Sequence, residues 1–146
     1  MDISHAANDF RGPFNTYVGL TFTQASNERV EAFADLDQRH QQPYGIVHGG
    51  VYATLIEATC STGAAADAMT RGMHAVGAEN STSFVRAFRS GRVTIVAIPL
   101  HRGRRSQVWR AEVRDPEDRL LAEGRVRCLC LEQDATLAGQ TVDVQP

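Results

Sequence analysis

The stretch that decides the fold is Gly49-Gly-Val-Tyr-Ala-Thr-Leu-Ile-Glu57-Ala-Thr-Cys-Ser-Thr-Gly-Ala-Ala-Ala66. It contains one charged residue, Glu57, and is apolar or small on nearly every side. A run of this length is too long for an ordinary strand, so it predicts a helix that is buried in the protein. A transmembrane helix is the competing interpretation, but a central glutamate and several small polar residues oppose it.

On both sides of this helix, apolar and polar residues alternate as they do in strands. Before it, residues 19–25 and 28–36 flank the turn pair Ser26-Asn27 and predict a hairpin. After it, we expect four more strands, at 75–88, 91–101, 106–115 and 120–131. This order predicts an α+β protein in which a curved antiparallel sheet wraps around one long central helix.

Length and composition are those of one globular domain. The chain has 146 residues, and its 42% hydrophobic and 22% charged content is ordinary for such domains. We expect a single domain over 1–146, with a core at about 19–131, a polar start and a loose tail from residue 133. The formal net charge of −2 gives no general attraction to nucleic acid or anionic membranes. The N-terminus lacks the features of a secretory signal, which favours the cytoplasm.

The central helix carries the residues that suggest chemistry. A carboxylate within an otherwise uncharged helix is costly to bury unless it is paired, so Glu57 needs an explanation. It either acts in a site, or it reaches a solvent-facing stripe or an arginine. Gly49 and Gly50 open the helix and leave its first N–H groups accessible to a ligand oxygen. Ser61 lies one turn after Glu57 on the same face, where it can orient a water molecule.

Helix geometry separates these groups. Gly49 and Glu57 are eight residues apart, so they lie about 12 Å apart along the axis at about 1.5 Å per residue. One helix therefore does not place both on one carbonyl group. Two antiparallel helices related by a two-fold axis would set Glu57 of one copy beside Gly49 of the other. The spacing predicts a homo-oligomer with shared sites, a homodimer or homotetramer.

The stretch Gln42-Pro-Tyr-Gly-Ile-Val-His48-Gly-Gly-Val-Tyr-Ala-Thr-Leu-Ile-Glu57, followed by Ser61, resembles a known family. It is similar to hotdog-fold thioesterases of the phenylacetate-pathway and Arthrobacter 4-hydroxybenzoyl-CoA thioesterase type, over about 19–131. The resemblance implies the hotdog fold and hydrolysis of an acyl-CoA thioester. It further implies that Gln42 holds the thioester or water, that the Gly49 N–H polarises the carbonyl, and that His48 shapes the start of the helix.

For the reaction, Glu57 is either a general base that activates water or a nucleophile that forms an anhydride. No cofactor is expected, because coenzyme A is part of the substrate, and the histidines share no metal-ligand spacing. Basic turns can hold the CoA phosphates, although a solvated turn is an equal alternative. The expected substrate-binding residues are Gly50, Asn80, Ser83, Arg86, Arg89, Gly103, Arg104, Arg105 and Ser106.

Two other functions remain open at this point. A hydratase or dehydratase of acyl thioesters would use His48 and Glu57 as its acid–base pair, and a non-catalytic protein would only bind an acyl-CoA or another small ligand. The acyl group is not fixed by the spacing. The three cysteines, Cys60, Cys128 and Cys130, lack a zinc-like or Cys-x-x-Cys spacing and are expected to be buried free thiols.

Overall fold

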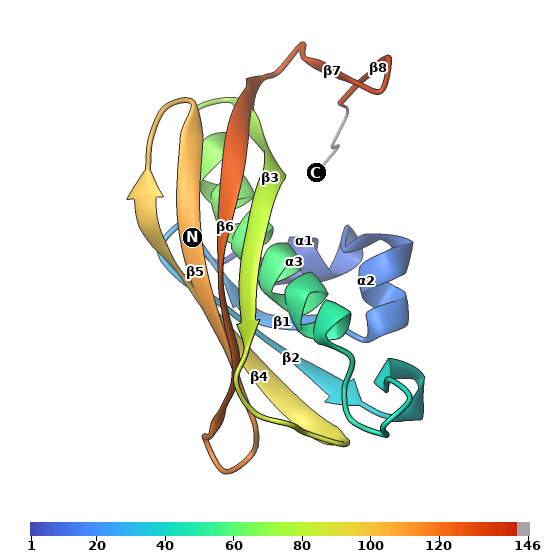
Figure 1. Ribbon diagram of the computed structural model, residues 1–146. Helices are drawn as coiled ribbons and strands as arrows, with labels where there is room; N and C mark the ends of the chain where they lie inside the picture. The colour runs from blue at the N-terminus through green and yellow to red at the C-terminus, as the bar shows by residue number, and fades with distance from the viewer. Residues whose placement is uncertain (143–146) are drawn as a thin grey trace.

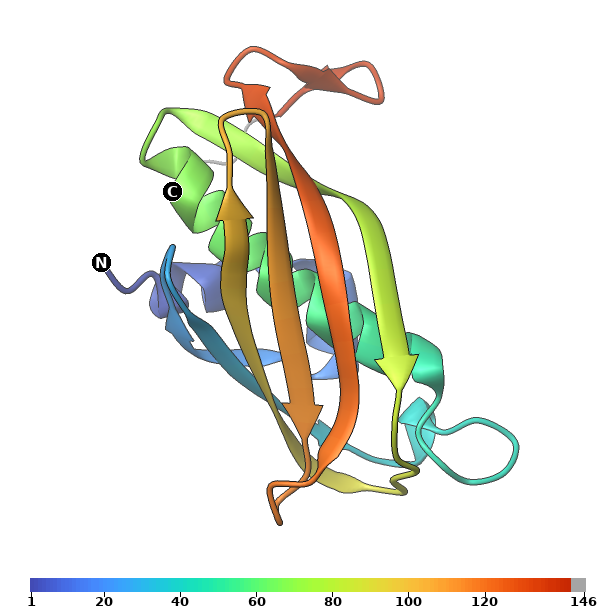
Figure 2. The same cartoon turned by 60° about the vertical axis from the view of Figure 1, so that its left-hand side comes forward.

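The computed structural model describes residues 1–142 and contains a six-stranded antiparallel sheet curved around a long helix, α3 (Figures 1 and 2). Helix α3 spans Gly49–Met69. The strands follow the order β1-β2-β4-β5-β6-β3 across the sheet. Their bounds are β1 Thr21–Ala25, β2 Val30–Leu36, β3 Met73–Phe84, β4 Gly91–Arg102, β5 Ser106–Arg114 and β6 Leu120–Glu132. This is the hotdog fold, and the predicted α+β class is confirmed.

The sheet and α3 pack closely because small residues of the helix face large residues of the sheet. A Cβ atom at Gly63 would lie 2.4 Å from the ring of Trp109, which is fully buried on β5. The Trp109 indole N–H donates to Gln107 Oε1 at 2.9 Å, and Gln107 Nε2 donates to the carbonyl of Ala64 at 3.1 Å. The buried polar groups at this contact are thus satisfied, as a stable core requires.

The far end of α3 is fixed by charge. The helix runs three residues beyond its predicted end, and Asp67 in its last turn is buried. Asp67 pairs with Arg71 at 2.6 Å and with Arg102, the last residue of β4, at 3.7 Å. Within residues 1–142, no helix is long and apolar enough to cross a membrane.

The N-terminal segment differs from the polar start that the sequence predicted. It forms two short helices, α1 at Ser4–Asp9 and α2 at Gly12–Val18, which lie beside α3 (Figure 1). They are fastened to β1, because the Asn8 side chain exchanges hydrogen bonds of 2.8 and 2.9 Å with the backbone of Phe22. The predicted loose tail also contains a small hairpin, β7 Thr136–Leu137 and β8 Gln140–Thr141, and residues 143–146 lie outside the described part.

The remaining predictions about the elements are confirmed within a few residues. The hairpin of β1 and β2 is paired antiparallel, and a short 3-10 helix, η1 at Gln38–His40, lies in the predicted loop before α3. The three cysteines are free and buried. Burial raises the pKa of the Cys60 thiol far above its ordinary value, and the pKa of Cys128 is also raised, mainly by burial.

Candidate functional site

The start of α3 has one backbone donor that the protein leaves unused. His48 is the N-cap residue, and its Nδ1 accepts a hydrogen bond of 2.8 Å from the Gly50 N–H. The Val51 N–H donates to the His48 carbonyl at 2.9 Å. Among residues 1–142, the Gly49 N–H has no hydrogen-bond partner. Because it lies at the positive end of a 21-residue helix, it is suited to a ligand oxygen that carries negative charge.

A hollow of about 280 Å³ surrounds this free donor. It is lined by Gln42, Ile46, Val47, Gly49, Tyr52, Phe84, Val85, Arg86 and Ala87. Glycine at position 49 lets the ring of Phe84 pack against the start of the helix, because a Cβ atom there would lie 2.4 Å from that ring. The Gln42 side-chain oxygen accepts a hydrogen bond from the Tyr44 N–H, which fixes the amide at the rim. The structure thus brings Gln42, Gly49 and Arg86 together, three residues that the sequence assigned to the site.

Tyr52 belongs to the same hollow and was not anticipated from the sequence. Its side chain is 2% exposed, and its hydroxyl has no hydrogen-bond partner within the described residues. Burial raises the pKa of this phenol to about 12, so the group stays protonated at neutral pH. The signal available in the sequence was its spacing, since a residue three positions after Gly49 lies on the same face of the helix.

Glu57 lies in a separate groove between α2 and α3. The groove has a volume of about 550 Å³, and its lining includes Arg11, Asn15, Glu57 and Ser61. Glu57 is exposed in the single chain, which corrects the expectation of a buried carboxylate, because it faces the open groove beside the edge strand β3 and not the interior between α3 and the sheet. The predicted proximity of Glu57 and Ser61 is confirmed, since both line this groove.

The Glu57 carboxylate is held by Asn80 of β3. Asn80 Nδ2 donates to Glu57 Oε2 at 3.3 Å and to the carbonyl of Ala53 at 2.9 Å. The Thr82 hydroxyl donates to Asn80 Oδ1 at 2.6 Å, which fixes the orientation of the amide. The sequence named Asn80 only as a lining residue and did not suggest Thr82, because a contact between a strand and a helix leaves no short-range pattern.

A bulge in β3 brings the strand close to this carboxylate. The register of β3 against β6 shifts between Gly77 and Glu79. A Cβ atom at Gly77 would lie 3.5 Å from Glu57 Oε1 and 3.6 Å from Ser61 Oγ. The glycine therefore leaves space beside both side chains. A small molecule that enters the groove can reach the carboxylate and the hydroxyl together.

The predicted parts of the site lie in two places within one chain. The Gly49 hollow and the Glu57 groove share no lining residue. This agrees with the expectation from helix geometry that one helix cannot present Gly49 and Glu57 to the same carbonyl group. Ser83, another residue predicted to bind substrate, is exposed on β3, and it lines neither the hollow nor the groove.

The predicted basic residues are also divided. Arg86 and Arg89 precede β4, whereas Gly103, Arg104, Arg105 and Ser106 follow or end it, so the two groups are separated by the length of a strand, about 36 Å at about 3.3 Å per residue. Arg89 donates to the carbonyl of Gly45 at 3.1 Å. Arg104 and Arg105 are exposed. One chain alone therefore does not gather these arginines into one phosphate site.

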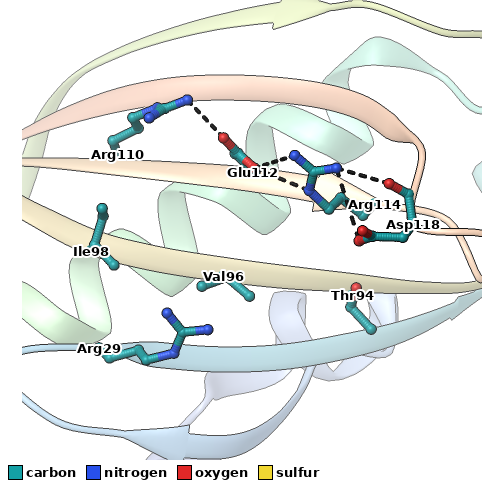
Figure 3. Close-up of a pocket in the computed structure, with 8 residues that line it drawn as sticks. All are labelled: Arg29, Thr94, Val96, Ile98, Arg110, Glu112, Arg114 and Asp118. Atoms are coloured by element: carbon teal, nitrogen blue, oxygen red, sulfur yellow. Dashed lines mark hydrogen bonds and ion pairs between the residues drawn. The ribbon is translucent and has the colours of Figure 1, made fainter.

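A further hollow, of about 370 Å³, lies on the outer face of the sheet and has a different character (Figure 3). Its lining residues are Arg29, Thr94, Val96, Ile98, Arg110, Glu112, Arg114 and Asp118. Glu112 pairs with Arg110 at 2.7 Å and with Arg114 at 2.8 Å (Figure 3). The Glu112 carboxylate is thus neutralised by two arginines, and Asp118 also lies 3.9 Å from Arg114. We therefore place the candidate site on α3.

Comparison with known proteins identifies the family of the chain. The family described as Thioesterase superfamily matches residues 44–122, which include Glu57 and the start of α3. A Mycobacterium tuberculosis protein named as a candidate esterase is 42% identical over 122 residues, covering 82% of this chain and 87% of that protein. Its solved structure covers 83% of this chain and 98% of its own, with a TM-score of 0.81.

Two relatives have names that specify a thioester reaction. The 1,4-dihydroxy-2-naphthoyl-CoA hydrolase of Escherichia coli is 37% identical over 111 residues, covering 75% of this chain and 80% of that protein. The proofreading thioesterase EntH of Cronobacter sakazakii is 35% identical over 117 residues, covering 79% and 83%. The narrower assignment to the phenylacetate-pathway or Arthrobacter type stays a prediction. By its fold and by these matches, the chain belongs to the thioesterase superfamily of thioester hydrolases.

Proposed function

We propose that this protein hydrolyses acyl-CoA thioesters and that Glu57 is the catalytic carboxylate. The observation that carries the proposal is the accessible Glu57 carboxylate, which shares a groove with Ser61 and is oriented by Asn80. A general base must lie within hydrogen-bond reach of the water that it activates, and a solvent-filled groove provides that water. The E. coli relative, named for hydrolysis of a CoA thioester, supports CoA as the leaving group.

In the proposed reaction, Glu57 removes a proton from water as the oxygen attacks the thioester carbonyl carbon. The negative charge that develops on the carbonyl oxygen is stabilised by the Gly49 N–H, a contribution typically worth a few kcal/mol per donor. The C–S bond then breaks, and the CoA thiolate takes the proton. Direct attack by Glu57 on the thioester would form a mixed anhydride and use the same residues. A single turnover in water labelled with ¹⁸O distinguishes the two routes, because opening of the anhydride places the label on the Glu57 carboxylate.

The proposed active unit contains at least two copies of the chain. The Glu57 groove of one copy would meet the Gly49 hollow of the other across a two-fold axis. Strand β3 supports this arrangement, because it lies at an edge of the sheet and has no further strand beyond it among the described residues. Arg86 is the proposed cation for CoA at the hollow, and Arg104 and Arg105 would join it from a second copy.

The geometry of His48 favours hydrolysis over hydration or dehydration. An acid–base role in those reactions needs a free imidazole nitrogen near the substrate. His48 Nδ1 accepts the Gly50 N–H and caps the helix, so the neutral ring carries its proton on Nε2 and neither nitrogen is free to act as a base. We therefore propose that His48 positions the start of α3 and takes no part in proton transfer.

Thiol release from acyl-CoAs by the wild type, Glu57→Gln and Glu79→Gln tests the proposal. We expect Glu57→Gln to lower kcat by about 10²- to 10⁴-fold, as loss of a general base typically does. Glu79 is the matched control, because it is an exposed glutamate of the same strand that holds Asn80. Tight binding without turnover in the wild type would instead identify a non-catalytic acyl-CoA binding protein.

A further inference from the structure

A trough continues from the Glu57 groove along α3, beneath the N-terminal helices. The groove shares Arg11, Asn15, Ala58 and Ser61 with a second hollow of about 330 Å³. This hollow shares Met69 with a third, of about 250 Å³, so the three adjoin one another. From Glu57 to Met69 the helix rises about 18 Å, since twelve residues rise about 1.5 Å each. The trough is long and begins at the proposed catalytic carboxylate.

Beyond Ser61 the trough is apolar. There the helix contributes the small side chain of Ala65, and the opposite wall contributes Ile3, Phe10 and Phe22. The remaining lining residues are Ala6, Ala7, Thr62, Met69 and Ala75. An apolar site of this size favours an apolar ligand with a few polar groups at one end.

The polar side chains of the trough lie mostly at its Glu57 end, because Arg11, Asn15 and Ser61 also line the Glu57 groove. The Thr62 hydroxyl donates to the carbonyl of Ala58 at 2.9 Å. The Arg11 guanidinium donates to the carbonyl of Leu20 at 2.8 Å. Beyond these three residues, toward Met69, a hydroxyl or carboxylate of a ligand would therefore lose its hydrogen bonds to water with little replacement, which is costly. The chemistry of the walls disfavours a hydroxylated acyl group.

Hydrogen bonds to β1, an edge strand of the sheet, hold α1 and α2 in place. The small side chains of α3 that line the trough remain uncovered by these helices. Asn8 is bonded to Phe22, and the Ile3 N–H donates to the carbonyl of Ala25 at 2.7 Å. Because these bonds join the segment to β1 of the same chain, the position of this wall of the trough does not depend on a ligand.

We propose that this trough is the acyl subsite and that the substrate is a thioester of an unbranched, apolar acyl chain of medium to long length. Its carbonyl would lie beside Glu57, and its far end would reach Met69 beneath the N-terminal helices. The N-terminal segment thereby sets chain-length specificity. This inference rests on the proposed function, because it takes the reacting carbonyl to be at Glu57.

The test compares kcat/KM for acetyl-, hexanoyl-, dodecanoyl- and 4-hydroxybenzoyl-CoA in the wild type and in Ala65→Leu. The added side chain projects into the trough, so we expect dodecanoyl-CoA hydrolysis to fall by about tenfold or more and acetyl-CoA hydrolysis to fall much less, because the short acetyl group does not reach residue 65. Phe10→Ala should weaken the preference for the long chain, whereas Tyr17→Ala should not. Phe10 and Tyr17 are 56% and 61% exposed, and only Phe10 lines the trough.

Calorimetric titration of the Glu57→Gln protein with the same acyl-CoAs separates the two proposals. The acyl subsite is supported if longer acyl chains bind more tightly and if adding Ala65→Leu abolishes this dependence on chain length. This holds even if no thioester is hydrolysed. Hydrolysis that prefers 4-hydroxybenzoyl-CoA, or that Ala65→Leu lowers equally for all chain lengths, overturns the acyl subsite and leaves the proposed function standing.

Discussion

The two edges of the sheet are treated differently by this chain. At the β1 edge, the N-terminal segment supplies hydrogen bonds to the backbone of Phe22 and Ala25, so the edge is covered. At the β3 edge, no strand or helix of the described residues pairs with the outer side. An uncovered edge offers a row of backbone donors and acceptors to another chain. The hydrogen-bonding groups of the β1 edge are therefore partly used within the chain, whereas those of the β3 edge are available to another chain.

The difference matters because each edge borders a different part of the proposed site. The segment that covers β1 also forms the outer wall of the trough along α3. Strand β3 contains the bulge at Gly77 and the amide of Asn80, both directed at Glu57. The β1 edge thus shapes the space for a ligand. The β3 edge orients the proposed catalytic carboxylate and is placed to pair with a second copy of the chain.

The largest effect on self-association is expected from placing a charge on the uncovered edge. Ser81→Lys puts two like charges close together wherever two β3 strands meet across a two-fold axis, which should weaken self-association by at least about tenfold, equivalent to about 1.4 kcal/mol. Activity should fall with it if the site is shared. Thr23→Lys is the matched control, because Thr23 is an exposed hydroxyl residue on β1, and light scattering after gel filtration provides the measurement. Unchanged association in Ser81→Lys would show that β3 is not the meeting surface.

The parts of the molecule that the sequence predicted well are those with a local pattern. Helix α3 was predictable because it combines great length with a nearly uncharged composition, and β5 because buried Gln107, Trp109, Ala111 and Val113 alternate with outward residues. The geometric separation of Gly49 and Glu57 followed from the rise of the helix alone. Local periodicity and helix geometry were sufficient for these features.

The features that the sequence missed depend on contacts between distant segments. Helix α1 has only six residues and no buried side chain, so its position comes from hydrogen bonds such as those of Asn8 to β1. The relay from Thr82 through Asn80 to Glu57 joins β3 to α3 across 23 residues. The exposure of Glu57 followed from which side of α3 the sheet covers, and the composition of the helix does not specify that side.

A smaller effect is expected from loosening the relay on the β3 side. Thr82→Val keeps the shape of the side chain but removes the hydroxyl that fixes the Asn80 amide, so kcat should fall by about threefold to tenfold with little change in KM. Thr82→Ser keeps the hydroxyl and should restore kcat. A rise in KM at constant kcat would instead assign Asn80 to substrate binding and contradict its role in positioning Glu57.

On the covered edge, Asn8→Ala should cost stability rather than catalysis. It removes two hydrogen bonds to Phe22 and leaves backbone groups of β1 without partners, at about 1–3 kcal/mol in the free energy of unfolding. Urea denaturation measures the change, and Asp9→Ala is the control, because Asp9 is exposed and pairs only with exposed His5. Equal stability of the two variants would mean that the N-terminal helices are not held by these bonds.

The smallest effect is expected from the pH dependence of the same edge. The N–H groups of Ala25 and Ser4 donate to Asp2 Oδ1 at 2.9 Å each, and these bonds hold the pKa of the Asp2 carboxyl below its ordinary value of 3.8. A lowered pKa means that the carboxylate stabilises the docked segment above about pH 4, and that this contribution is lost as the pH falls through the folded-state value. Amide-exchange protection of the Ala25 N–H should therefore decline at acidic pH in the wild type and stay level in Asp2→Asn. A decline of the same size in both proteins would show that another group controls the acid sensitivity of the covered edge.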